Sequence, residues 1–171
     1  MKKIVVFGKP GSGKSTLSKS LASATEIKLH ALDSIEFKKN GSRVGRVAYD
    51  EEHESILSSE SWIIDGFGPI ESFYKRLDVA DTLIYIELPY PICYWLVTKR
   101  LLKGLFIKPE GWPDGSSILK GTLESYKVLR ICPKFWNKNF MQKLDKISTN
   151  KSLYVIRSVS ELNSFVDKNV K

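Results

Sequence analysis

The sequence has 171 residues, of which 42% are hydrophobic, and a formal net charge of +8 at pH 7. This length fits a single domain of α/β size, and the apolar fraction is sufficient for a hydrophobic core. No uninterrupted apolar stretch approaches the roughly 20 residues that a membrane-spanning helix requires, so we expect no contact with a membrane interior.

The first predicted elements enclose a phosphate-binding motif. Residues 4–7 form a short apolar run rich in β-branched side chains, which predicts a buried strand of about 3–8. Apolar residues at helical spacing then predict a helix of about 13–24. The turn between them, residues 8–15, reads G-x-x-x-x-G-K-[ST], and a strand–loop–helix context is the one in which a P-loop occurs.

The residue types of this P-loop explain why it would bind phosphate. Glycines let the backbone curl so that several N–H groups face one anion, and the following helix adds its positive end. Lys14 is expected to reach the β- and γ-phosphates, and the Ser15 hydroxyl is expected to hold Mg²⁺. We therefore predict binding of a nucleoside triphosphate with magnesium. The predicted binding residues are Gly8, Pro10, Gly11, Ser12, Gly13, Lys14, Ser15 and Thr16.

An acidic residue follows each of the next two predicted strands. Asp33 comes just after a strand of about 27–32, and Asp65 ends the apolar strand 62–65. Since ligands of an open parallel sheet bind beyond the carboxyl ends of its strands, both carboxylates are expected beside the P-loop. Asp33 would accept the proton of an attacking hydroxyl or orient the acceptor, or else cap the turn at Ser34. Asp65 would hold magnesium, directly or through water, or else serve an ordinary Asp-Gly turn.

The remaining elements continue an alternation of helices and strands, which favours an α/β fold with a parallel sheet covered on both faces. An irregular stretch at 38–48 precedes the next helix, and His53 on the polar face of that helix is expected to be structural. The expected helices span about 50–59, 70–77, 90–103 and, broken near Pro133, the region up to about 147. The expected strands are 82–88 and 153–156, and Ser160 is expected to cap a last helix.

A loop rich in glycine and proline interrupts this pattern at 104–116. Its position between helices, flanked by basic residues, suits a small lid that closes over phosphates, which we assign to about 104–130. A plain connection between helices is the alternative. The chain is expected to form one domain over 1–171, because it contains neither repeats nor a linker.

The positive charge is concentrated in one part of the chain. Residues 96–151 contain 12 basic and 4 acidic residues, whereas residues 1–95 contain 12 basic and 13 acidic ones. Such a segment could meet nucleic acid or an acidic membrane face, clamp a polyphosphate, or simply remain solvated. Arg157, just after the last strand, is expected near a nucleotide base. The candidate cations for neutralising charge on a transferred phosphoryl group are Lys14, Arg100, Lys103 and Arg130.

Four further segments accompany the P-loop in order along the chain: Leu32-Asp33-Ser34, 62–66, 80–85 and 155–158. With them the chain resembles the adenylate-kinase-like P-loop kinases, and within these the bacterial DNA topology modulation proteins. The resemblance implies a three-layer α/β/α P-loop NTPase fold with five parallel strands in the order 2-3-1-4-5. It also implies ATP with Mg²⁺ and phosphoryl transfer to a small acceptor. One departure is that Phe67-Gly68 follow the Asp-Gly pair, where those bacterial proteins usually carry Asn-Tyr.

The predicted function is therefore that of an ATP-dependent phosphotransferase, an adenylate-kinase-like kinase whose acceptor is a small molecule such as a nucleotide or nucleoside. A GTPase is one alternative, because residues 65–68 match D-x-x-G, although no N-K-x-D motif follows. Another is a nucleotide-binding regulatory module that contacts nucleic acid through residues 96–151. We expect a cytoplasmic monomer or dimer in which Cys93 and Cys132 are reduced thiols.

Overall fold

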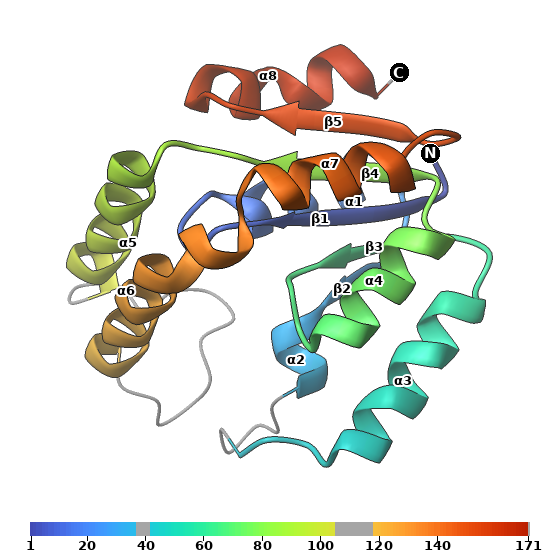
Figure 1. Cartoon of the computed structure of the whole chain (residues 1–171), viewed down its shortest axis with the longest axis horizontal. Helices are drawn as coiled ribbons and strands as arrows, with labels where there is room; N and C mark the ends of the chain where they lie inside the picture. Colours follow the sequence, from blue (N-terminus) through green and yellow to red (C-terminus); the bar gives the residue numbers. More distant parts are fainter. Residues whose placement is uncertain (37–41, 105–117, 171) are drawn as a thin grey trace.

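The fold is built on a parallel β-sheet of five strands (Figure 1). The structure, a computed structural model, describes residues 1–36, 42–104 and 118–170. The strand order is β2-β3-β1-β4-β5, and every pairing is parallel, which confirms the predicted sheet. The strands are β1 (Lys3–Gly8), β2 (Leu29–Ala31), β3 (Trp62–Asp65), β4 (Thr82–Ile86) and β5 (Ser152–Ile156).

Helices cover both faces of the sheet, so the domain has the three layers that were predicted. One face packs against α3 (Arg46–Ser58), α4 (Ile70–Val79) and α7 (Lys138–Ile147). The other face packs against α1 (Lys14–Thr25), α5 (Tyr90–Gly104), α6 (Ile118–Phe135) and α8 (Val159–Asn169). A short helix, α2 (Leu32–Glu36), follows β2. Among the described helices, none is both long enough and apolar enough to span a bilayer.

The central strand β1 shows why the middle of this sheet is apolar. Ile4 and Val6 belong to the cluster formed with α1, α5, α6 and α8, whereas Val5 and Phe7 belong to the cluster formed with α3, α4 and α7. All four side chains are fully buried. Successive side chains of a strand point to opposite faces, and a strand covered on both faces therefore needs a continuous apolar run. Because this buried run holds β1 in the middle of the sheet, it also determines where the P-loop begins, at the end of β1.

Capping, rather than proline, decides where the predicted long helical region is divided. The predicted break near Pro133 is confirmed, although Pro133 itself lies inside α6 and the helix ends at Phe135. The next helix, α7, begins after Asn137, whose side chain accepts a hydrogen bond from the Phe140 N–H at 3.1 Å. That bond satisfies one of the first N–H groups of α7, which would otherwise lack a partner.

The last helix begins two residues earlier than predicted. Its cap is Ser158 rather than Ser160, and the Ser158 hydroxyl accepts a hydrogen bond from the Glu161 N–H at 3.1 Å. The Glu161 carboxylate in turn accepts from the Arg157 N–H at 2.8 Å. The sequence pattern S-x-x-E at 158–161 identifies such a capping box, so the correct start could have been found in the sequence.

Most of the predicted lid loop lies outside the described residues. Of the proposed lid at 104–130, the structure describes Gly104, which ends α5, and residues 118–130, which belong to α6. The two helices pack against each other and lie side by side in Figure 1. The lid assignment for 105–117 stays a prediction.

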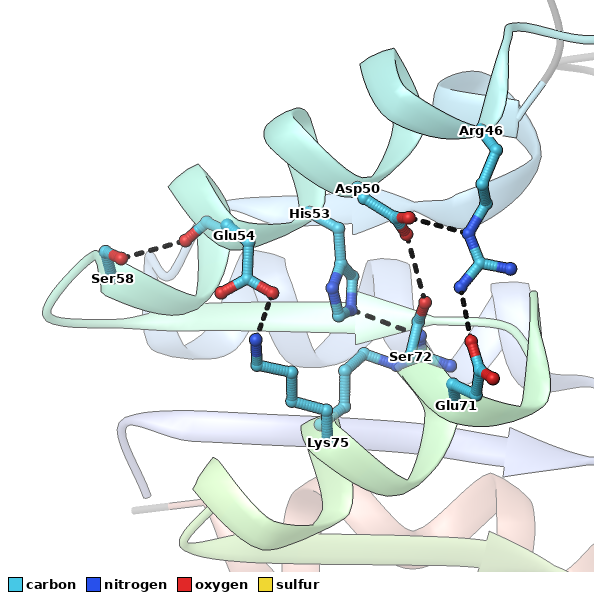
Figure 2. A network of polar contacts seen from close by, with 9 residues as sticks. Arg46, Asp50, His53, Glu54, Ser58, Glu71, Ser72 and Lys75 are labelled. Carbon is cyan, nitrogen blue, oxygen red and sulfur yellow. Dashed lines mark hydrogen bonds and ion pairs between the residues drawn. The ribbon is translucent and has the colours of Figure 1, made fainter.

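Polar contacts join α3 to α4, and Figure 2 shows them. Arg46 binds Glu71 at 2.9 Å, and Lys75 binds Glu54. These ion pairs are exposed to solvent, where such pairs contribute little to stability. His53 lies between them and points toward α4, but it is only 1% exposed. The predicted polar-face position of His53 is therefore wrong, because tertiary packing of α4 covers it.

Burial has a direct consequence for the ionisation of His53. Desolvation and the nearby Arg76 cation lower the pKa of His53 to about 4. The imidazole is therefore neutral at pH 7 in the folded protein, whereas an unfolded histidine takes up a proton near pH 6.5. As the pH falls from 6.5 toward 4, the unfolded state binds more protons than the folded state, and stability decreases.

We predict that His53→Gln weakens this pH dependence. One pKa unit corresponds to about 1.4 kcal/mol, so His53 accounts for up to roughly 3 kcal/mol of lost stability between pH 7 and pH 4. Urea unfolding of both proteins at the two pH values measures the difference. His30→Gln is the matched control. This variant should lose most of the stability that the wild type loses between pH 7 and pH 4, because His30 is only partly buried. Equal losses in wild type and His53→Gln would contradict the assignment.

Candidate active site

Two neighbouring strands deliver the predicted site residues to one edge of the sheet. β1 and β3 pair in parallel, with Val6 opposite Asp65. The P-loop leaves β1 at Gly8, two residues beyond Val6, so Asp65 and the P-loop emerge side by side. The register of this pair therefore brings together residues that are more than 50 positions apart in the sequence.

A large cleft of about 1510 Å³ opens at this edge. Its volume exceeds that of a usual single-ligand pocket, so it has room for two small molecules. The walls come from the P-loop and the start of α1, the ends of β2 and β3, and the facing sides of α5 and α6. The charged residues among the described lining are Lys14, Asp33, Asp65, Lys99, Arg100, Lys103 and Lys134.

The P-loop runs so close to β4 that its first position admits only glycine. Gly8 has a φ of +150°, and a Cβ atom there would stand 2.4 Å from the Ile86 carbonyl oxygen. At the other end, Gly13 precedes α1, and none of the described side chains caps that helix. The first N–H groups of α1 lie where residues 14–16 line the cleft. Uncapped N–H groups at a helix start form a natural anion site.

The two P-loop lysines have different surroundings. The Lys14 ammonium lines the cleft and donates a hydrogen bond to the Lys9 carbonyl at 2.9 Å. The Lys9 side chain is buried, with its ammonium 4.6 Å from the centre of the Tyr90 ring. Lys14 is thus the P-loop lysine that can turn toward a ligand. Lys9 was not singled out by the sequence, because its position in the motif is variable.

Asp65 presents a buried carboxylate to the P-loop. It is 6% exposed, and within the described residues its Oδ1 atom has no hydrogen-bond partner. Burial raises the pKa of Asp65, whereas the Lys14 ammonium and the Ser15 hydroxyl act in the opposite direction. A buried carboxylate oxygen is costly unless a donor or a cation meets it.

The surroundings of Asp65 fit a magnesium ion, since Mg²⁺ prefers oxygen ligands and is usually held by one or two protein groups together with phosphates. Ser15 and Asp65 supply a hydroxyl and a carboxylate of this kind. In the described ranges, no group of three or more His, Cys, Asp and Glu side chains is suited to hold a metal alone. A magnesium ion here would therefore need the phosphates of a bound nucleotide as further ligands.

Asp33 lines the cleft from the first turn of α2. Its side chain is exposed, and its charge influences the pKa values of both Asp65 and Arg100. Because α2 begins at Leu32, Asp33 is already inside the helix and does not precede it as a cap residue would. The structure thus brings Asp33 to the same cleft as Asp65 and the P-loop.

Arg100 is the predicted cation that α5 brings into the cleft. Its guanidinium is half-buried and donates a hydrogen bond to the Ser125 hydroxyl on α6 at 2.9 Å. Burial lowers the pKa of Arg100, and the Asp33 carboxylate opposes this effect. Lys103 lines the cleft as well, one turn further along α5. Both cations line the same cleft as the P-loop.

Three other predicted residues are not among the described lining of the cleft, namely Ser12, Arg130 and Arg157. Ser12 is fully buried within the P-loop. Arg130 is exposed on α6. Arg157 follows β5 and donates from Nε to the Glu87 carboxylate at 3.1 Å. The predicted roles of Arg130 as a phosphate clamp and of Arg157 as a neighbour of the nucleotide base stay predictions.

The sequence did not reveal the aromatic wall of the cleft. Phe67, Phe135 and Trp136 line it together. Trp136 stacks on Tyr85 at 5.2 Å, and Phe67 meets Phe135 edge-on at 4.9 Å. These residues come from the turn after β3 and from the end of α6, and only folding brings them together. The one signal available was the aromatic residue that directly follows Asp65-Gly66.

The whole chain is similar to solved structures of small-molecule kinases. A gluconokinase from Sinorhizobium meliloti aligns over 99% of this chain and 89% of its own, with 16% identity and a TM-score of 0.52. A sugar kinase from a Janibacter species aligns over 98% and 91%, with 15% identity and a TM-score of 0.51. A shikimate kinase from Bacteroides thetaiotaomicron aligns over 96% and 94%, with 15% identity and a TM-score of 0.52.

The fold is that of the P-loop kinases. No protein-family model matches the sequence, and none of the curated proteins matches it either. At 15–16% identity, the structural similarity establishes the fold of this chain and leaves its chemistry to be argued from the site.

We predict that Asp65→Asn separates stability from ligand binding. Because burial disfavours the charged carboxylate, replacing it with a neutral amide should leave the thermal midpoint unchanged or raise it by a few degrees. Magnesium-dependent binding of ATP should nevertheless fall at least about tenfold, since a metal ligand is lost. Thermal unfolding and calorimetry with and without Mg²⁺ measure the two effects. Unchanged Mg·ATP affinity would contradict the assignment of Asp65.

Proposed function

We propose that this protein is an ATP-dependent phosphotransferase that acts on a small-molecule acceptor. The observation that carries the proposal is the carboxylate of Asp65. It is buried beside the uncapped start of the P-loop helix, with one oxygen lacking a partner in the described residues, and it faces a cleft large enough for two ligands.

The P-loop side of the cleft would bind the donor. The residues at 8–16 would enclose the β- and γ-phosphates, with the Lys14 ammonium exchanging its bond to the Lys9 carbonyl for phosphate oxygens. Ser15 and Asp65 would hold magnesium. When bound, Mg²⁺ neutralises charge on the transferred group. The absence of a carboxylate cluster beside these two residues in the described ranges fits a metal that arrives with the nucleotide.

The opposite side of the cleft would bind and activate the acceptor. Asp33 is exposed to the cleft and is suited to accept the proton of the attacking hydroxyl. Arg100 and Lys103 line the same cleft and would stabilise negative charge on the phosphoryl group. The hydroxyl oxygen of the acceptor would attack the γ-phosphorus, the bond to the ADP oxygen would break, and the hydroxyl proton would pass to Asp33.

The aromatic wall favours an acceptor with a flat ring, such as a nucleoside or nucleotide. Phe67, Phe135 and Trp136 offer stacking surfaces and apolar contact. A polyol would instead need several polar partners for its hydroxyl groups. The related structures carry names of gluconate, sugar and shikimate kinases, so sugars belong in the same acceptor test.

The distribution of the basic residues favours phosphate binding over nucleic-acid binding. Lys99, Arg100, Lys103 and Lys134 of the basic segment all line the cleft. Part of the positive charge of residues 96–151 is therefore directed at the candidate active site rather than at an outer surface. This arrangement is the one expected for cations that act on a transferred phosphoryl group.

We predict that two variants separate donor binding from transfer. Lys14→Ala should abolish ATP turnover, because the main cation at the β- and γ-phosphates is lost. Asp33→Asn should bind ATP within about twofold of wild type and lose transfer by roughly 100-fold or more, as expected for removal of a general base. Acceptor-dependent release of ADP, screened over nucleosides, nucleotides and sugars, provides the assay.

The exposed Asp145 on α7 offers a matched control, since Asp145→Asn removes an equal charge outside the described lining of the cleft. Normal transfer by Asp33→Asn would exclude Asp33 as the proton acceptor. Absence of any heat when Mg·ATP is mixed with the wild-type protein would exclude the proposed function as a whole. Preference for GTP over ATP in competition would support the GTPase alternative instead.

A further inference from the structure

The turn that follows Asp65 has an unusual backbone. Gly66 and Gly68 have φ values of +122° and +59°, a region that side chains with a Cβ atom rarely adopt. The Gly66 N–H still bonds to the Val6 carbonyl of β1 at 3.2 Å, and beyond it the chain leaves the sheet. The carbonyl groups of Gly66 and Phe67 therefore need hydrogen-bond donors from outside the sheet.

One buried side chain supplies these partners. Arg76, on α4, is 0% exposed, and its Nη2 donates to the Phe67 carbonyl at 2.5 Å and to the Gly66 carbonyl at 3.4 Å. A guanidinium has a rigid fork of donors and can hold two acceptors at once in a fixed geometry. Arg76 thus holds the carbonyl groups of the two residues that directly follow Asp65.

The Arg76 charge is balanced by dipoles rather than by a carboxylate. Within the described residues, none of the ion pairs includes Arg76, and its Nε atom is buried without a hydrogen-bond partner. Burial lowers the pKa of Arg76 to about 10, so the group remains charged at neutral pH. A buried cation without a carboxylate partner is costly, and its cost is reduced here by the hydrogen bonds that it donates.

Two residues of α3 support Arg76 and the turn that it binds. The Arg76 Nη1 atom lies 3.3 Å from His53 Nε2, and because His53 is neutral, that nitrogen can accept the hydrogen bond. Tyr49 stacks on His53 with ring centres 5.8 Å apart. Its hydroxyl lies 2.7 Å from where a Cβ atom on Gly68 would stand, so Tyr49 also confines the turn. In Figure 2, the His53 side chain projects from α3 toward α4.

We propose that Arg76 is a positioning residue for phosphoryl transfer: it locks the turn 66–68 and so fixes both the Asp65 carboxylate and the Phe67 ring. This inference rests on the proposed function, in which Asp65 would hold the magnesium ion and Phe67 would contact the acceptor. Arg76 does not line the cleft among the described residues, so its effect passes through the backbone of the turn. His53 and Tyr49 support it from α3.

The variant Arg76→Lys tests this proposal because it keeps the positive charge and loses the forked geometry. Hydrogen exchange of the amides at 66–68 should accelerate about tenfold or more in the protein without nucleotide, while amides of β1 remain protected. The half-saturating Mg²⁺ concentration for ATP binding should rise about 10- to 100-fold, as for other residues that orient metal ligands. Affinity for metal-free ATP should stay within about twofold, since the P-loop is untouched.

Lys151→Met is the matched control. Its ammonium also donates to two backbone carbonyls of α4, those of Leu77 and Asp78, but at the end of the helix remote from the cleft. Lys151→Met should lower stability in urea without changing exchange at 66–68 or the Mg²⁺ dependence. Arg76→Gln, which removes the charge, should affect the turn at least as strongly as Arg76→Lys.

The outcomes distinguish the two proposals. If exchange at 66–68 and the Mg²⁺ dependence are unchanged in Arg76→Lys, or change only in proportion to global stability as in Lys151→Met, the positioning role is overturned. If wild type binds no ATP at all, the proposed function fails. The exchange measurement then still decides whether Arg76 locks the turn.

Discussion

The parallel pairing of β1 with β3 is the constraint on which the site depends. It sets Val6 opposite Asp65, so the P-loop and the carboxylate leave the sheet at the same edge and the same height. A slip of one residue in this register would move the Asp65 side chain to the other face of the sheet. The apolar side chains of both strands prevent such a slip, because each is buried against a helical layer.

The site is built from charges in places where charges are costly. Asp65 is buried with an unpartnered oxygen in the described part of the chain, and Arg76 is buried without a carboxylate. Each is tolerable because of its neighbours: Lys14 and Ser15 for the carboxylate, backbone carbonyls for the guanidinium. In a medium of low dielectric, electrostatic interactions with such groups are stronger than in water.

The helices α5 and α6 together supply another wall of the cleft. Arg100 on α5 binds Ser125 on α6, and the Tyr126 hydroxyl on α6 lies 2.6 Å from the Thr98 hydroxyl on α5. These contacts join the two helices beside the basic side chains that α5 contributes to the cleft. The aromatic end of α6 then packs on the core through Trp136. One helical pair thus provides both basic side chains and apolar surface to the same cleft.

The sequence by itself determined the strands, the phosphate-binding motif and the two acidic residues at the ends of β2 and β3, because each is a local pattern with a local physical cause, whereas the strand order came from the resemblance to a family. Apolar runs specify buried strands, glycines specify the tight loop beside β4, and a carboxylate after a parallel strand reaches the ligand edge. Only the tertiary structure decided the burial of His53, the hydrogen bonds that surround Arg76, and the aromatic wall at Phe67 and Trp136. These depend on which helix faces cover one another, and that is settled by long-range packing rather than by neighbours in the chain.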